Sequence, residues 1–151
     1  MEPIPKPALY LGLAGLLPFV WGALTALSPT LSGWAMGFVT PMYVGAYVSL
    51  TYGTIILAFM SGVLWGFASR ATEGSSPMDY VFSVIPALWA FFMVNGQDAG
   101  ASAINLAAGF AGLLLLDWHF WKKGAAPDWW LGLRAGLTVV VLICLSVLIV
   151  L

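Results

Sequence analysis

Charged side chains are scarce in this sequence. Only 7% of its 151 residues are Asp, Glu, Lys or Arg, whereas a soluble domain averages about 25%. Hydrophobic residues make up 62% of the chain, so a water-soluble fold could not cover its surface with polar groups. About 20 apolar residues cross a bilayer, and five crossings would use about 100 residues. The sequence therefore predicts an all-α, polytopic membrane protein whose residues 1–151 form a single integral membrane domain.

Cysteine, histidine and positive charge are also scarce. The single cysteine, Cys144, cannot form an internal disulfide, and it lies in an apolar run where a thiol acts as a small hydrophobic group. His119 is the single histidine, so the sequence offers no cluster of His and Cys ligands, and we expect neither a metal ion nor another cofactor. The net charge of -1, with only five Lys and Arg residues, excludes nucleic acid as a partner.

Five apolar segments, bounded by Pro, Gly, Ser, Asp and Lys residues, predict a bundle of five transmembrane helices. The predicted helices are residues 8–27, 42–69, 80–94, 99–118 and 129–151. Asp79, Asp98 and Asp128 each precede a segment, where a carboxylate can accept the free N–H groups of the first helical turn. Pro86 is expected to bend the third helix. The uncharged connection 28–41 is expected to lie flat at the membrane interface or to dip into it.

All the basic residues fall on one side of this arrangement. They are Lys6, Arg70, Lys122, Lys123 and Arg134. Basic residues in short loops resist translocation, so the N-terminus is predicted to be cytoplasmic and the C-terminus external. The first apolar stretch is longer than the core of a signal peptide and contains Pro18 and Trp21, which predicts a retained helix. With no Arg-rich transit peptide, the sequence favours a multi-pass protein of the bacterial cytoplasmic (inner) membrane.

Asp117 and Arg134 are the most informative charges. Arg134 lies six residues beyond Asp128, about 9 Å along a helix axis, so its charge lies inside the membrane edge. Asp117 ends the apolar run of the fourth predicted helix, and a short hairpin would bring it beside Arg134 at a similar depth. Because an unpaired charge at this depth costs a few kcal/mol, we predict a structural ion pair between these two residues.

Small residues recur at intervals of four on two of the predicted helices. They are Thr54, Ala58, Gly62 and Gly66 on the second helix, and Gly132 and Gly136 on the fifth. Lipid supplies no hydrophobic drive between helices, so helices approach closely where side chains are small. We predict that these residues pack helices of the same chain against one another. A homodimer seam is the alternative.

Catalytic motifs are missing from the sequence, which contains no phosphate loop, dinucleotide fingerprint, HExxH or CxxC. No acidic or basic side chain falls in the middle third of a predicted helix, where transporters and channels place their ionisable groups. We therefore predict no catalytic residues. An enzyme would require a site at the membrane rim built from Asp117, His119 and Arg134.

Two non-enzymatic functions remain open. The first is an accessory, assembly or structural component that packs with other membrane proteins and has no buried cavity. The second is a binder or carrier of a small hydrophobic ligand, such as a lipid, a quinone or a porphyrin. Its pocket would lie between the first four predicted helices. The side chains expected to line it are Trp21, Tyr52, Trp65, Trp89 and Asn105.

Several patches of sequence, in order along nearly the whole chain, resemble one family. They are LGLAGLLPF at residues 11–19, YG at 52–53, SGVLWG at 61–66, IPAL at 85–88, Asp117, PDWW at 127–130, LR at 133–134 and LT at 137–138. The family is a domain of unknown function found in small multi-helix bacterial inner-membrane proteins, with a mitochondrial transmembrane-protein relative. The resemblance implies a compact helical membrane domain and supplies no activity.

Overall fold

The structure is a computed structural model that describes residues 3–70, 76–94 and 98–151. Every regular element in these segments is helical. The elements are α1 (Lys6–Ala14), α2 (Leu17–Leu27), α3 (Pro29–Ala35), the 3-10 helix η1 (Pro41–Tyr43), α4 (Gly45–Arg70), α5 (Pro77–Met93), α6 (Ala99–Lys122) and α7 (Trp130–Val150).

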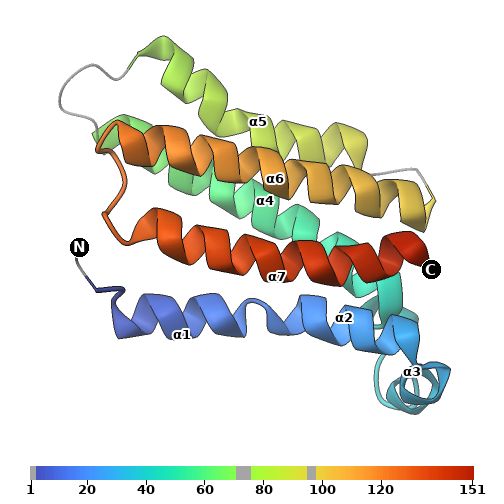
Figure 1. Cartoon of the computed structure of the whole chain (residues 1–151). Coiled ribbons are helices and arrows are strands. Elements are labelled where there is room, and N and C mark those ends of the chain that lie inside the picture. Colours follow the sequence, from blue (N-terminus) through green and yellow to red (C-terminus); the bar gives the residue numbers. More distant parts are fainter. Residues whose placement is uncertain (1–2, 71–75, 95–97) are drawn as a thin grey trace.

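The long helices form a bundle in which α2 continues the direction of α1 and the chain then reverses at α4, α5, α6 and α7 (Figure 1). In the described residues, four helical stretches are long and apolar enough to cross a membrane. They are Lys6–Leu27, Gly45–Arg70, Ala99–Lys122 and Trp130–Val150. α5 is apolar but shorter, with 17 residues. The protein is therefore a helical membrane protein.

The first predicted helix is not continuous, because residues 8–27 are divided between α1 and α2. Proline has no N–H group, so Pro18 cannot donate the hydrogen bond that a helix would direct to the carbonyl of Ala14. α1 ends at Ala14, and the Leu16 N–H donates instead to the Leu13 carbonyl over 3.0 Å. The predicted segment 8–27 thus corresponds to the candidate span Lys6–Leu27, with a break after Ala14 that was not predicted.

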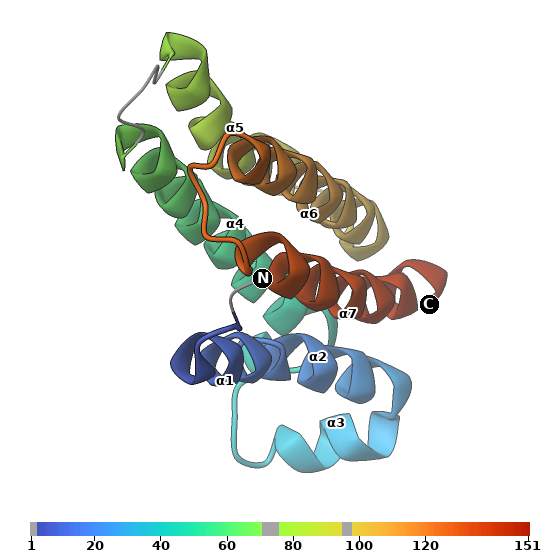
Figure 2. The same ribbon diagram turned by 60° about the vertical axis from the view of Figure 1, so that its left-hand side comes forward.

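The connection between α2 and α4 folds back beside α2. Ser28 caps α3, since its hydroxyl accepts a hydrogen bond from the Leu31 N–H over 3.2 Å. Thr25 of α2 accepts a hydrogen bond of 2.7 Å from the Gly45 N–H at the start of α4. α2 thus lies between α3 and α7 (Figure 2). Trp34 is 63% exposed on this connection, as expected of an aromatic side chain at a membrane interface.

Pro86 lies inside α5 and leaves part of its backbone without internal partners. The freed N–H of Ala87 donates a 2.8 Å hydrogen bond to the Ser61 hydroxyl on α4. Figure 1 shows α5 changing direction along its length. The proline therefore both bends α5, as expected, and joins it to α4.

Of the three predicted aspartate caps, one is present. Asp98 caps α6 by accepting the Ala101 N–H over 2.8 Å. Ser76 caps α5, and Asp79 lies in the first turn of that helix. α7 begins after Trp129 without a side-chain cap. The prediction that Asp79 and Asp128 are caps was wrong.

Close helix contacts occur at glycines other than those in the predicted motifs. A Cβ atom on Gly53 would lie 2.5 Å from Leu106, and one on Gly109 would lie 2.8 Å from Trp89 and 2.9 Å from Leu57. These contacts hold α6 against α4 and α5.

The predicted packing residues face outward instead. A Cβ atom on Gly62, Gly66, Gly132 or Gly136 would meet no heavy atom within 4 Å. Ala58 is exposed, and the Thr54 hydroxyl donates to the Leu50 carbonyl of its own helix over 2.8 Å. The prediction that these residues pack helices within the chain was wrong for the four glycines and Ala58, because residue spacing alone does not show which face of a helix meets its neighbour.

Candidate ligand-binding pocket

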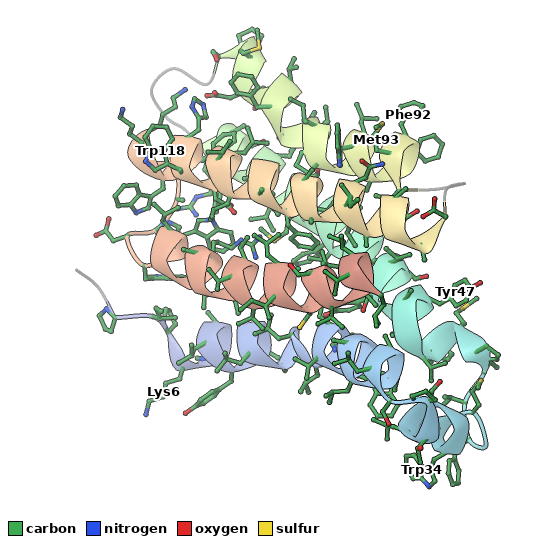
Figure 3. The ribbon with its side chains drawn as sticks, turned by 45° about the vertical axis from the view of Figure 1, so that its right-hand side comes forward. Lys6, Trp34, Tyr47, Phe92, Met93 and Trp118 are labelled. Carbon is green, nitrogen blue, oxygen red and sulfur yellow. The ribbon has the colours of Figure 1, made fainter. Side chains whose placement is uncertain are left out.

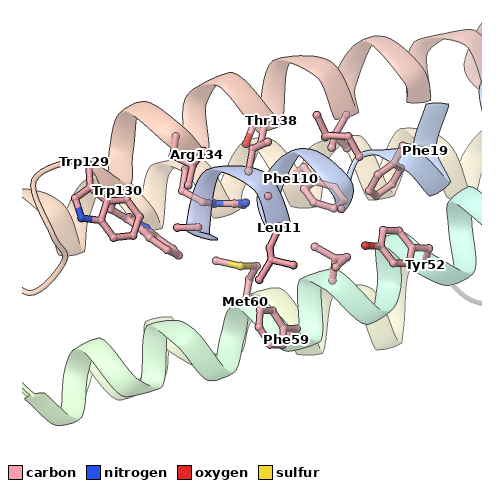
Figure 4. A pocket seen from close by; sticks show the side chains of 18 residues that line it. Leu11, Phe19, Tyr52, Phe59, Met60, Phe110, Trp129, Trp130, Arg134 and Thr138 are labelled. Atoms are coloured by element: carbon pink, nitrogen blue, oxygen red, sulfur yellow. The ribbon is translucent and has the colours of Figure 1, made fainter. Parts of the chain in front are cut away.

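A pocket of about 350 Å³ lies among α1, α2, α4, α6 and α7 (Figure 4). This volume lies within the range of about 300–1,000 Å³ that is usual for small-molecule sites. Its wall is mostly apolar and includes Leu11, Phe19, Phe59, Met60 and Phe110. The site can therefore hold the hydrocarbon part of a small molecule.

Two polar side chains of α7 also line this pocket. Arg134 is 7% exposed and Thr138 is 1% exposed. The Nη2 atom of Arg134 and the Oγ1 atom of Thr138 make no hydrogen bond with any described residue. Figure 4 shows both on the α7 wall of the pocket. An unpartnered buried polar group is costly, so the pair is suited to a ligand that completes its hydrogen bonds.

Arg134 is held in place by Asp117 of α6. The guanidinium Nε lies 3.0 Å from Oδ2 of Asp117, and the Trp130 indole N–H donates to Oδ1 over 2.9 Å. Asp117 is 0% exposed. The structure thus contains the ion pair expected from the sequence, and both carboxylate oxygens have partners. The Nη2 group of Arg134, which lines the pocket, is left without a partner among the described residues.

The residues predicted to bind a ligand do not converge on this pocket. Of that set, only Tyr52 lines it. The Trp21 indole donates to the Tyr43 carbonyl over 2.7 Å, and the Trp65 ring packs on Tyr80 at 4.8 Å. The Trp89 indole donates to the Asn105 carbonyl over 2.7 Å, while the Asn105 amide donates to the Met93 carbonyl over 2.8 Å.

Trp21, Trp65, Trp89 and Asn105 do not line this pocket: hydrogen bonds of Trp21, Trp89 and Asn105 join neighbouring segments of the fold, and Trp65 is half exposed with its ring against Tyr80. The predicted place of the pocket was also wrong in part. α7 forms one of its walls, and α5 contributes no lining residue.

A second cluster of charges lies near the start of α5 and the end of α6. Asp79 is 2% exposed, and its Oδ1 atom lies 3.0 Å from Nε2 of His119. Its other carboxylate oxygen accepts a hydrogen bond from the Lys123 ammonium group. This cluster was not predicted. The i, i+4 spacing of His119 and Lys123 places them on one helix face and was the signal available in the sequence.

The hydrogen bond of His119 to Asp79 shows that His119 does not join Asp117 and Arg134 in a single rim site, as an enzyme would need. Asp117 and His119 are two residues apart on α6, and such residues do not share a helix face. Asp117 pairs with Arg134, whereas His119 pairs with Asp79. The three residues that an enzyme would require at the rim therefore belong to two different ion-pair clusters.

Replacing Lys123 with Met is expected to lower the free energy of unfolding by about 1 kcal/mol, because it leaves a buried carboxylate with one cationic partner fewer. Unfolding by sodium dodecyl sulfate in mixed micelles, followed by circular dichroism, measures the change. Lys6→Met is the control, since Lys6 is exposed and has no ion pair in the described residues. Equal stability of the two variants would contradict the role given to Lys123.

The apolar helical stretches and the pocket between them define a multi-pass helical membrane protein. The chain belongs to the family described as "Protein of unknown function (DUF3429)", whose model matches residues 4–150. The family expected from the sequence is thereby confirmed. Neither the family description nor the names of the relatives below indicates an enzymatic activity.

The chain is similar to two curated vertebrate proteins. It is 37% identical over 144 residues to "Transmembrane protein 69" of Xenopus tropicalis, and this alignment covers 93% of the chain and 52% of the Xenopus protein. It is 31% identical over 154 residues to "Transmembrane protein 69" of Mus musculus, and this alignment covers 97% of the chain and 57% of the mouse protein. The chain therefore spans about half the length of these relatives. No solved structure matches the chain.

Proposed function

We propose that this membrane protein binds a small lipophilic molecule in the pocket among α1, α2, α4, α6 and α7. The observation that carries the proposal is the presence of two buried, unpartnered polar groups, on Arg134 and Thr138, in a mostly apolar pocket. Ligand sites commonly combine an apolar wall with a few polar groups that orient the ligand. An accessory component without a ligand was expected to have no such cavity.

Residues at the edge of the pocket are exposed on the outer surface of the bundle. Leu11 of α1 is 74% exposed and Phe59 of α4 is 65% exposed, and both line the pocket. α1 contains no buried residue, so it covers the pocket loosely. In a bilayer these surfaces would face lipid tails, which gives a lipophilic ligand a lateral route into the site.

Photolabelling tests this proposal. The protein is placed in nanodiscs with a hydrocarbon chain that carries a diazirine group, and the labelled residues are mapped by peptide mass spectrometry. We expect labels on buried pocket-lining residues such as Phe19, Met60 and Phe110, which are shielded from the lipid tails outside the pocket. Val141→Phe should abolish them, because Val141 is 4% exposed and lines the pocket.

Val139→Phe is the matched control. Val139 lies on the same helix, is 56% exposed and does not line the pocket. This variant should retain the labels of the wild type. Labelling spread evenly over the outer surface of the bundle, and equal in the two variants, would refute the proposed function.

We also propose that α5 spans the membrane as a fifth crossing, with the N-terminus cytoplasmic and the C-terminus external in a bacterial inner membrane. The 17 residues of α5 extend about 25 Å, and flanking polar residues can compensate for the shortfall from a hydrocarbon core of about 30 Å. Lys6, Arg70, Lys122 and Lys123 lie at one end of the bundle, where α1 begins and α4 and α6 end (Figure 1).

Interfacial aromatic residues support the same arrangement. Trp118 and Lys6 lie toward one end of the bundle, and Trp34 and Tyr47 lie toward the other (Figure 3). Tryptophan and tyrosine side chains gather at both interfaces of a bilayer. The labelled aromatic side chains thus mark two levels at which headgroups would contact the protein.

Reporter fusions in a bacterial host test this topology. A green fluorescent protein at the N-terminus should be fluorescent, and alkaline phosphatase at the C-terminus should be active, because the two ends are proposed to lie on opposite sides. Inactive phosphatase at the C-terminus, combined with fluorescence of a green fluorescent protein at that end, would contradict the odd number of crossings.

A role as an accessory or assembly component is the second candidate. It is favoured by the small residues that α4 leaves uncovered, including Ala58 and Gly62. The proposed partners are the lipid bilayer and, at this face, another membrane protein or a second copy of the chain. Co-purification of a membrane protein that is lost on Gly62→Leu would favour this role. Nucleic acid is not a proposed partner.

A further inference from the structure

The unpartnered groups of the pocket restrict the chemistry of its ligand. A guanidinium group carries five N–H donors and no acceptor, so Arg134 can bind only an acceptor atom. Its Nε is already directed to Asp117, while Nη2 has no partner among the described residues. Thr138 lies one helical turn further along α7, on the same face of the helix. One oxygen atom of a ligand could therefore accept hydrogen bonds from both side chains.

The charge of the site favours a neutral acceptor. Asp117 already neutralises Arg134 at a contact of 3.0 Å, and Asp117 is fully buried. A bound anion would add a second negative charge beside this pair in a medium of low dielectric constant, where both its desolvation and its repulsion from Asp117 are unfavourable. A carbonyl oxygen would accept the same hydrogen bonds without adding charge.

We propose that the ligand is a neutral lipophilic carbonyl compound whose oxygen accepts hydrogen bonds from Arg134 and Thr138. Its hydrocarbon part lies against the apolar wall that includes Phe19, Met60 and Phe110. This inference rests on the proposed function and adds the chemical class of the molecule that the pocket binds. The class includes free ketones and quinones as well as the ester carbonyls of bilayer lipids.

Competition against the diazirine-bearing hydrocarbon tests this class. Three probes of equal chain length are compared at equal concentration in nanodiscs of ether-linked phosphatidylcholine, which contains no carbonyl group. The probes are methyl undecyl ketone, dodecylphosphonate and tridecane. We expect the ketone to reduce pocket labelling at a concentration about three- to tenfold lower than tridecane, the effect of one or two net hydrogen bonds. Dodecylphosphonate should compete least.

Thr138→Val is the variant that tests the hydrogen bonds, because valine keeps the shape of threonine and lacks its hydroxyl group. It should reduce the advantage of the ketone over tridecane by about threefold or more. Labelling by the hydrocarbon probe itself should persist, which shows that the pocket is intact. Ser146→Ala is the matched control, since the Ser146 hydroxyl is on the same helix but bonds to the Leu142 carbonyl outside the pocket.

The possible results separate the two proposals. Three results would overturn the inference but leave a lipophilic pocket. The ketone and tridecane could compete equally, dodecylphosphonate could compete most strongly, or the advantage of the ketone over tridecane could be unchanged in Thr138→Val. Absence of pocket labelling by the diazirine probe would refute the proposed function, and this inference with it.

A final comparison identifies the source of the carbonyl group. Weaker pocket labelling in ester-linked than in ether-linked nanodiscs would support the inference and assign the carbonyl to bilayer lipid. Equal labelling in the two nanodiscs, together with competition by the ketone, would support it and assign the carbonyl to a separate molecule.

Discussion

Asp117→Ala is expected to lower the free energy of unfolding by about 3–5 kcal/mol, the usual cost of removing one partner from a buried ion pair. The substitution leaves the Arg134 guanidinium and the Trp130 indole without the carboxylate that both contact. Arg134 is 7% exposed, so its guanidinium group cannot reach water without a local opening of the bundle. Unfolding in sodium dodecyl sulfate, with circular dichroism as the readout, measures the loss.

Asp128→Ala is the control for this substitution. Asp128 is an exposed acidic residue, and its backbone carbonyl, which the substitution keeps, accepts a hydrogen bond from the Trp121 indole N–H. Its loss should change the free energy of unfolding by less than about 0.5 kcal/mol. Combining Asp117→Ala with Arg134→Met should restore part of the stability, because the uncompensated charge is removed. Equal effects of the two aspartate substitutions would contradict the account of the ion pair.

Gly22→Leu is expected to destabilise the protein by about 3 kcal/mol through overpacking. A Cβ atom at this position would collide with the Ser49 hydroxyl and would lie 3.0 Å from the backbone oxygen of Gly45. Backbone atoms cannot move aside as the end of a flexible side chain can. α2 and α4 would therefore separate where Thr25 and Gly45 join them.

Gly62→Leu is the matched control, since Gly62 also lies within a helix but has no heavy atom within 4 Å of a Cβ placed there. Both substitutions gain helix propensity by about 1 kcal/mol, so their difference reports packing alone. Gly62→Leu should be neutral or slightly stabilising in dilute detergent. A loss of stability as large as that of Gly22→Leu would show that the small-residue motif of α4 does pack within the chain.

Features that depend on composition and on short hairpins were predictable from the sequence. The low charge content required apolar helices, and the hairpin between α6 and α7 brought Asp117 and Arg134 to the same depth. The family resemblance followed from patches such as the stretch around Pro127 and Asp128. Local chemistry also predicted the cap at Asp98, because a carboxylate before a helix satisfies its first N–H groups.

Features that depend on how helices face one another were not predictable. The spacing of Gly62 and Gly66 defines a smooth strip but does not show whether a neighbouring helix lies on it. Tryptophan and asparagine side chains such as Trp89 and Asn105 were expected in a pocket, yet their hydrogen bonds join helices. The Asp79 and His119 pair spans 40 residues of sequence, so only the packing of α5 on α6 could place them together.

The break between α1 and α2 illustrates an intermediate case. Pro18 was visible in the sequence, and its missing N–H makes a continuous helix unfavourable. An apolar run nevertheless favours one continuous membrane helix. Whether the helix breaks at the proline depends on how the neighbouring side chains pack against other helices. In the structure, Phe19 in the first turn of α2 is 1% exposed and packs on Tyr52 and Phe110 with ring centroids 5.3 and 5.7 Å away.

The central claim is that the pocket beside Arg134 holds a small molecule within the membrane. Native mass spectrometry of the protein released from nanodiscs tests it most directly, with the wild type compared with the pocket-filling variant Val141→Phe. The account predicts an additional non-protein mass on the wild type that Val141→Phe lacks and Val139→Phe retains. A wild-type protein that carries no small molecule, or one whose bound mass is unchanged in Val141→Phe, would contradict it.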